Sequence, residues 1–249
     1  MKTCFVFLIT ILLIGCGKVE DKPLYPKVMN VILEHIKTTG PDEDSAHLIS
    51  GLRFVSWERR EEFAEATLPY LRDKDPEKVS GAIAVLYRLR NYRPMSDMGS
   101  DGGPTAWEQK YKPAPFWAKL DKNVYANLKH FHAIGNDNVF RNLALYLGSS
   151  PSKQGKQELI RIAKKTSAKE TSAKDQALIC LTWHRDPKDM KTLLPFMLEN
   201  TQASRSLPYQ FRVRYGKAAI PYLKKAITEA KSEKTRHAAK KELKRLEKQ

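Results

Sequence analysis

The amino-acid sequence predicts an all-α protein that carries an export signal at its start. Apolar residues recur three and four positions apart through most of the chain, which is the period of one face of a helix. The alternation of apolar and polar residues that is typical of strands is almost absent, and residues 52–55 are the one ambiguous stretch. The chain has 249 residues, of which 41% are hydrophobic, enough for one or two packed domains. Its three cysteines are too few for a disulfide-stabilised scaffold.

The first fifteen residues have the composition of a secretory signal. Met1, Lys2 and Thr3 form a short positive start, and residues 4–14 are apolar except for Thr10. This run has about half of the ~20 residues that a helix needs to cross a hydrocarbon core. A charged start, a short apolar centre and a small residue at the end favour a signal peptide. We therefore expect residues 1–15 to be removed and no later segment to enter the bilayer.

The end of this signal, Leu13-Ile14-Gly15-Cys16, resembles the lipobox of bacterial lipoproteins. The resemblance implies that the chain is cleaved before Cys16, whose sulfur is then acylated, so that Cys16 becomes a lipid anchor. Two or more acyl chains anchor a protein stably, whereas one chain binds only marginally. Gly17 in place of an Asp implies the periplasmic face of the outer membrane, if the source is Gram-negative. An ordinary cleaved signal with a chance cysteine and an uncleaved short anchor are the alternatives.

Beyond Cys16 the sequence predicts a short tether and then a helical body. Residues 16–26 are polar with two prolines, and ten extended residues reach at most ~35 Å. The body is expected over residues 27–249. A helical stripe is a segment in which apolar residues recur three and four positions apart. Such stripes lie at 28–36, 63–71, 79–90, 124–132, 140–147, 159–163, 177–181, 193–198, 219–227 and 238–246. Turn residues separate these stripes, and Pro76 and Pro187 stand where the first turn of a helix tolerates proline.

Three of the predicted helices share a proline-containing pattern. It reads Leu-Pro-Tyr-Leu at 68–71, Leu-Pro-Phe-Met at 194–197 and Ile-Pro-Tyr-Leu at 220–223, and an Ala-rich helical segment follows the first and third. This arrangement resembles HEAT repeats, most clearly over 68–90 and 217–246. Arg236 matches the arginine of the family's second helix, whereas Ser80 stands there in the first copy. The resemblance implies an α-solenoid of antiparallel helix pairs.

The usual role of such repeats is to bind other macromolecules. The resemblance therefore implies a non-enzymatic protein-binding or scaffolding module of the bacterial cell envelope that needs no cofactor. The charge adds a second possibility, because residues 1–150 carry a net charge of +2 and residues 151–249 carry +14. Lys224 and Lys225 are candidates for binding an anionic lipid, a polysaccharide or an acidic protein, and a merely solvated face is the alternative. An exported protein is not expected to bind nucleic acid.

Residues 91–117 form a long stretch without helical periodicity, which we expect to be a loop insert. Loops of this length in a compact body are functional or disordered, so the insert is the first candidate for partner contact. Trp107 and Trp117 are its candidate binding residues. The main alternative to a binding module is an envelope enzyme with its site in this insert.

The insert also contains an imperfect calcium-loop pattern. Asp97, Asp101 and Glu108 occupy positions 1, 5 and 12 of such a loop. Position 3 is Gly99, which has no side-chain ligand, and Pro104 at position 8 has no backbone N–H. A plain loop is therefore favoured over a calcium site.

The remaining candidates for chemistry are weak. His130 and His132 are two residues apart, so on a helix they point in different directions and make a poor zinc pair. Cys180 stands in an apolar run, which favours a buried thiol over a ligand. We expect no metal site, and the sequence contains no convincing catalytic constellation.

Overall fold

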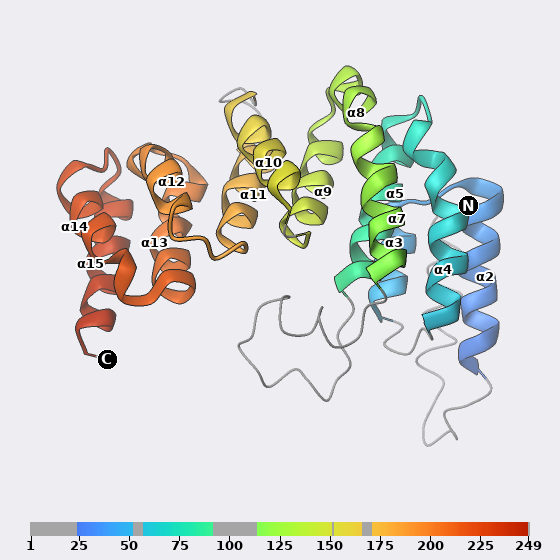
Figure 1. Ribbon diagram of the computed structural model, residues 1–249, viewed down its shortest axis with the longest axis horizontal. Helices are drawn as coiled ribbons and strands as arrows, with labels where there is room; N and C mark the ends of the chain where they lie inside the picture. The colour runs from blue at the N-terminus through green and yellow to red at the C-terminus, as the bar shows by residue number, and fades with distance from the viewer. Residues whose placement is uncertain (1–23, 52–56, 92–113, 151, 166–170, 249) are drawn as a thin grey trace. The chain divides into compact units, whose positions relative to one another are not determined.

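The computed structural model describes residues 24–51, 57–91, 114–150, 152–165 and 171–248. All regular secondary structure within these ranges is helical, which confirms the all-α prediction (Figure 1). The chain forms two compact units, Met1–Ile134 and Gly135–Gln249. The predicted signal peptide, Cys16 and the ambiguous stretch at 52–55 lie outside the described residues, as does most of the 91–117 insert.

Unit 1 is built from helices that pack on their near neighbours in the chain. The helix α2 contacts α3 and α4, while α5 contacts α3, α4 and the 3₁₀ helix η1. Its core includes the fully buried Ile36, Phe63, Ile83 and Leu120. The elements are α2 (Leu24–Thr39), α3 (Glu43–Gly51), α4 (Trp57–Thr67), η1 (Leu68–Arg72), α5 (Pro76–Asn91), α7 (Ala114–Ala126) and α8 (Leu128–Ile134). Thus α2 begins within the stretch that the sequence predicts to be a tether.

Two prolines set helix boundaries in unit 1. Pro76 is the first residue of α5, as expected, because its missing N–H has no helical partner at that position. Asp75 caps the same end, since its Oδ1 accepts a hydrogen bond of 2.9 Å from the backbone N–H of Glu77. Pro69 stands at the start of η1, where the chain tightens from α4 into 3₁₀ geometry.

A glycine allows the turn after α2 to lie directly on α5. A Cβ atom on Gly81 would come within 2.3 Å of the backbone oxygen of Pro41 and 2.6 Å of the Cα of Asp42. Asp42 is fixed in this turn by Ser45, whose backbone N–H and hydroxyl both donate to its Oδ1. Burial opposes ionisation of Asp42, but the hydrogen bonds from Ser45 and the nearby His35 outweigh it and lower the pKa of Asp42.

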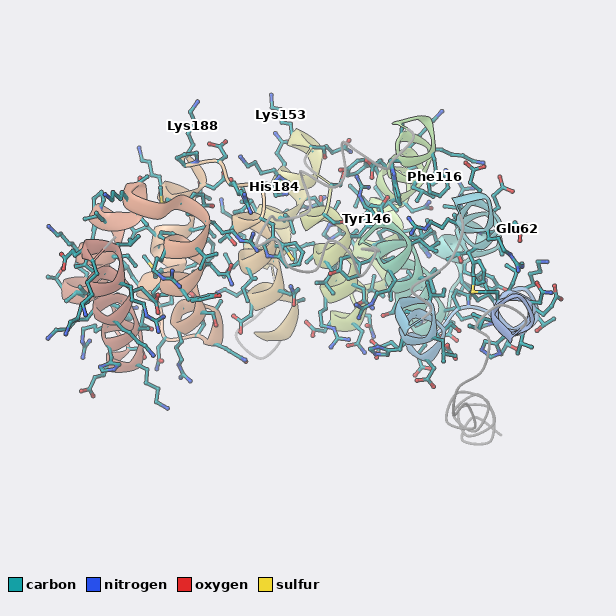
Figure 2. The ribbon with its side chains drawn as sticks, turned by 90° about the horizontal axis from the view of Figure 1, so that it is seen from below. Glu62, Phe116, Tyr146, Lys153, His184 and Lys188 are labelled. Atoms are coloured by element: carbon teal, nitrogen blue, oxygen red, sulfur yellow. The ribbon has the colours of Figure 1, made fainter. Side chains whose placement is uncertain are left out.

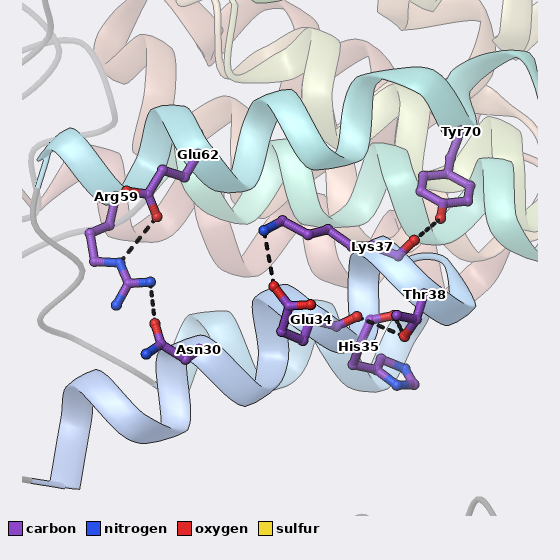
Figure 3. A network of polar contacts seen from close by, with 8 residues as sticks. All are labelled: Asn30, Glu34, His35, Lys37, Thr38, Arg59, Glu62 and Tyr70. Carbon is purple, nitrogen blue, oxygen red and sulfur yellow. Dashed lines mark hydrogen bonds and ion pairs between the residues drawn. The ribbon is translucent and has the colours of Figure 1, made fainter.

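Polar contacts join α2 to α4 and η1 along one side of unit 1 (Figure 3). Arg59 of α4 donates through Nη2 to Asn30 Oδ1 of α2 at 2.6 Å. The hydroxyl of Tyr70 in η1 donates to the backbone oxygen of Lys37 at 3.1 Å. These exposed contacts fix the register of the helices more than they stabilise them, because surface polar pairs contribute about 0–1 kcal/mol each.

The stripe at 124–132 predicts a single helix, but the structure has two, α7 and α8, that meet at Asn127. The backbone N–H of Asn127 bonds to the oxygen of Val124 at 3.1 Å, three residues back instead of four. Its buried side chain bonds to the oxygen of Asn123 at 2.8 Å and accepts from Arg72 Nε at 3.3 Å. An asparagine that hydrogen-bonds the local backbone in this way competes with the regular helix.

Unit 2 contains two sets of helices that alternate along the chain. The helices α9, α11, α13 and α15 pack on one another in that order. Of the other set, α10 packs on α9 and α11, α12 packs on α11, α13 and α14, and α14 packs on α15. The elements are α9 (Asp137–Gly148), α10 (Lys153–Lys165), α11 (Thr171–Thr182), α12 (Asp189–Leu198), α13 (Gln202–Tyr215), η3 (Gly216–Ala219), α14 (Ile220–Glu229) and α15 (Glu233–Glu247).

Polar side chains near the starts of α9, α11 and α13 lie close to the next helix of the same set. Asp137 Oδ1 of α9 accepts from the backbone N–H of Ala173 in α11 at 3.2 Å. The buried Asp175 of α11 lies near the backbone N–H of Ala203 in α13, but neither of its carboxylate oxygens has a hydrogen-bond partner among the described residues. The hydroxyls of Ser204 in α13 and Thr235 in α15 are 3.2 Å apart. The same edge of each helix thus carries a polar side chain close to its successor.

Pro187 was expected in the first turn of a helix, but α12 begins two residues later, at Asp189. The backbone N–H groups of Asp189 and Met190 bond three residues back, to Asp186 and Pro187. The proline therefore stands in a tight turn that leads into the helix.

Candidate functional site

The structure places three of the residues that the sequence singled out for binding. Trp117 lies on α7 in unit 1, and Lys224 and Lys225 lie side by side in sequence on α14 in unit 2. Cys16 and Trp107 lie outside the described residues. The same holds for the acidic residues of the calcium-loop pattern, Asp97, Asp101 and Glu108, and thus for the enzyme alternative that depends on the insert.

Trp117 is a core residue of unit 1. Its relative exposure is 6%, and the ring of Phe116 meets it edge-on with centroids 4.9 Å apart. The guanidinium of Arg90 in α5 lies 5.2 Å from the centre of the indole ring. Arg90 is itself held by Asp121, with an Nη1–Oδ1 distance of 2.5 Å. The contact between the Arg90 guanidinium and the indole ring of Trp117 joins α5 to α7.

Lys224 and Lys225 are exposed to solvent. Lys225 Nζ is 3.7 Å from Glu229 Oε2, one helical turn away, in a pair whose two side chains are about half exposed. Such a pair contributes only about 0.3–0.5 kcal/mol. Other lysines of unit 2 extend in the same way, as Figure 2 shows for Lys153 and Lys188. The two candidate lysines are thus accessible to an anionic partner.

A shallow hollow of about 180 Å³ lies between α4 and α7 in unit 1. Lys119 bridges the two helices there, with its Nζ 2.8 Å from Glu65 Oε1. Ligand pockets for drug-sized molecules usually have ~300–1,000 Å³, so this hollow is smaller than a usual ligand site. It is lined by Glu61, Ala64, Glu65, Leu68, Phe116, Lys119 and Leu120.

A group of ionisable side chains in unit 2 surrounds Lys156 of α10. Its Nζ lies 2.7 Å from Asp186 Oδ2 and 2.8 Å from Asp189 Oδ1, in the turn before α12 and at its start. Burial opposes the charge of Lys156, but these two hydrogen bonds outweigh burial and raise the pKa of Lys156. The ammonium is therefore held in its charged form, which is a poor nucleophile or base.

Three neighbouring groups are less well paired. Asp189 Oδ2, His184 Nε2 and the hydroxyl of Tyr215 are buried without a hydrogen-bond partner among the described residues. Burial raises the pKa of Asp189 and of Tyr215, and burial together with the Lys156 ammonium lowers the pKa of His184. The ion pairs of Lys156 with Asp186 and Asp189 tie α10 to the turn between α11 and α12 and to the start of α12.

Cys180 confirms the expectation of a buried thiol. It is fully buried in α11, where Gly148 of α9 packs against its side chain. Burial raises the pKa of Cys180 to about 12, although a hydrogen bond from Gln176 opposes the shift. Within the described residues no group of three or more His, Cys, Asp or Glu side chains is arranged to hold a metal ion.

The most distinctive surface feature was not predicted from the sequence. Tyr209 and Val213 lie one turn apart on α13 and are 48% and 41% exposed. The Arg212 guanidinium lies 5.4 Å from the centre of the Tyr209 ring. The spacing of Arg205, Tyr209 and Val213 is a usable helical signal, but Pro208 within the helix obscured it.

No helix in the described part of the chain combines the length and apolarity needed to cross a membrane. Comparisons with known proteins found no matching family model, no matching curated protein and no matching solved structure.

Proposed function

We propose that this chain is a lipid-anchored envelope protein whose helical body is a HEAT-like solenoid that binds or scaffolds other proteins. The observation that carries the proposal is the packing in unit 2, where α9, α11, α13 and α15 contact one another in chain order. In repeat proteins each helix pair buries its apolar face against the next pair and leaves an extended surface for partners. The hydrogen bonds that join α9 to α11 and α13 to α15 support the same arrangement.

The anchor in this proposal is Cys16. A small residue and then a cysteine directly follow an apolar run of signal-peptide length, and the next described element, α2, begins at Leu24. Few residues thus separate Cys16 from the helical body, which would hold the body close to the lipid surface.

Partitioning between detergent and water tests the anchor. Wild-type protein expressed in a bacterial host is expected in the detergent phase, and Cys16→Ser in the aqueous phase. Cys4→Ser is the matched control, because it removes a thiol from the signal without touching the lipobox. If Cys16→Ser stays in the detergent phase, the acyl anchor is wrong.

A second candidate function is the binding of an anionic lipid or polysaccharide. It is favoured by the charge of residues 202–249, which contain 14 Lys and Arg but only four Asp and Glu. Exposed basic residues near an anionic leaflet contribute about 1 kcal/mol each. This function predicts that Lys224→Glu together with Lys225→Glu weakens sedimentation with phosphatidylglycerol vesicles. Binding of a protein through a surface other than Lys224 and Lys225 instead predicts cross-linked partners in membranes whose yield does not change in the double variant.

A further inference from the structure

One face of unit 2 combines exposed apolar side chains with guanidinium groups. It consists of Arg205, Tyr209, Arg212 and Val213 of α13 and Arg245 of α15, and is called here the arginine–tyrosine face. Arg205, Tyr209 and Val213 follow one another at intervals of four residues, so they lie along one side of α13. Tyr209 and Val213 belong to the few large hydrophobic side chains of the described residues that are substantially exposed.

The face is fixed before any partner arrives. The Arg212 guanidinium lies against the Tyr209 ring and donates through Nε to Glu242 Oε2 of the neighbouring helix α15. Glu242 is buried, so this pair is shielded from solvent. A tyrosine that is already held by a neighbouring cation loses less conformational entropy when a partner covers it.

The face also carries excess positive charge. Arg245 Nη1 donates to Glu242 Oε1 at 2.8 Å, so two guanidinium groups share one carboxylate. The Arg245 side chain is about half exposed and keeps donors available to solvent. Arg205 adds a third guanidinium at the start of the stripe. The face as a whole therefore favours a partner that brings its own carboxylates.

The composition of the face favours a protein partner over a lipid surface. Tyrosine and arginine are enriched at the energetic centres of protein interfaces, whereas lysine is depleted there. Guanidinium groups bind carboxylates through two parallel hydrogen bonds, which selects a defined geometry. An anionic bilayer would be served equally well by lysine. The charged residues that define this face are arginines, while α15 also carries the exposed Lys240, Lys241 and Lys244, and α14 carries the exposed Lys224 and Lys225.

We propose that the arginine–tyrosine face binds an acidic segment of a partner protein. One aliphatic or aromatic side chain of the segment covers Tyr209 and Val213, and its carboxylates pair with Arg205 and Arg245. The inference rests on the proposed binding function and names its surface and the class of its partner.

Selection from a pool of displayed random 16-residue peptides tests this inference. The full chain is immobilised, and retained peptides are synthesised with a fluorophore and titrated by fluorescence polarisation. We expect the selected peptides to contain several Asp or Glu residues around an aliphatic or aromatic residue. Tyr209→Ala and Arg205→Glu should each weaken their binding about tenfold or more, which is typical of an interface hot spot.

Two exposed residues elsewhere provide matched controls. Val31→Ala removes an exposed apolar side chain from α2, and Lys191→Glu reverses an exposed charge on α12. Both should leave peptide affinity within about twofold of wild type. Because all four substituted side chains are exposed, thermal melts by circular dichroism should coincide.

Several outcomes would overturn the inference. They are the selection of no peptide, of peptides without acidic residues, or of peptides that bind Tyr209→Ala as tightly as wild type. An equal loss in Lys191→Glu would indicate general charge attraction, and binding to phosphatidylglycerol vesicles without acidic peptides would identify a lipid surface. If these results occur while cross-linked partners persist in membranes, the binding function stands and only this face is excluded.

Discussion

At His184 the folded protein favours the neutral imidazole. Burial and the nearby Lys156 ammonium lower its pKa, whereas Asp186 and a hydrogen bond with the Leu147 backbone oppose the shift. Below the unfolded pKa of about 6.5, the histidine of the unfolded chain binds a proton more readily than the histidine of the folded protein, so protonation favours unfolding. Above that pH the imidazole is neutral in both states, and the fold does not bear this cost.

This shift predicts how stability depends on pH. The free energy of unfolding should decrease as the pH falls from about 6.5 toward the folded pKa of His184. Urea titrations at pH 7.5 and pH 5.5 measure the decrease, and His184→Gln, which cannot titrate, should show a smaller one. The lowered pKa of Asp42 affects stability only below about pH 3.8. The raised pKa values of Asp175 and Asp189 act in the opposite direction as the pH falls, so the difference between the two proteins isolates the contribution of His184. Equal decreases in both proteins would contradict the assignment.

The close contact at Gly81 gives a second prediction at the scale of one residue. Alanine normally favours a helix over glycine by about 1 kcal/mol. At Gly81 the added Cβ meets backbone atoms of Pro41 and Asp42, which cannot rotate away. Gly81→Ala should therefore destabilise the protein, by about 1–3 kcal/mol as for other overpacked sites. Chemical denaturation measures this, and a more stable variant would show that the turn does not lie on α5.

At the scale of the element, the start of α13 depends on a reciprocal cap. Thr201 Oγ1 accepts from the Ser204 backbone N–H, and Ser204 Oγ accepts from the Thr201 N–H, both at 3.1 Å. The hydroxyl of Ser204 also reaches Thr235 in α15. Ser204 therefore both caps its own helix and contacts the next.

This double role predicts unequal effects of two substitutions. Thr201→Ala should cost about 1 kcal/mol, the usual value of an N-cap. Ser204→Ala should cost more, because it also leaves the buried Thr235 hydroxyl without its partner in α13. Thermal denaturation of the two variants compares them, and Asn136→Ala, at the simple cap of α9, is the control for an ordinary cap. An equal loss in all three would argue against the α13–α15 contact.

Some helices could be predicted from the spacing of apolar residues in the sequence, and others could not. Stripes with regular spacing, such as 79–90 and 140–147, predicted α5 and α9, because their buried residues recur at helical intervals. The helix α13 was missed because Pro208 interrupts its pattern, although the helix continues through it. The boundary between α7 and α8 depends on the buried contact of Asn127 with Arg72, 55 residues away in sequence, which local spacing does not reveal.

The candidate site was predictable only in part. The clustering of charge in the sequence singles out Lys224 and Lys225, and the structure places both on the exposed side of α14. The burial of Trp117 does not follow from the sequence, since it depends on Arg90 reaching across from α5. Tyr209 was not identified because Pro208 obscures the helical spacing of Arg205, Tyr209 and Val213. The contribution of Arg245 comes from a second helix, α15, which local spacing does not reveal.

At the scale of the whole molecule, the division into two units makes a prediction about fragments. The helices of unit 2 bury a core of their own, which includes Tyr146, Leu178, Leu207 and Phe211. A fragment of residues 135–249 should therefore fold alone, with a helical circular dichroism spectrum and one cooperative thermal transition. A broad, non-cooperative transition would show that the core of unit 2 is incomplete without the preceding residues.

The chain-order packing of unit 2 also has a kinetic consequence. The main contacts of each helix are with helices one or two places away along the chain, so few require the closure of a long loop. Chains dominated by such local contacts fold faster than those that must first join distant segments. The helices of unit 2 can therefore assemble in chain order, each one adding to a surface that its predecessors have already formed.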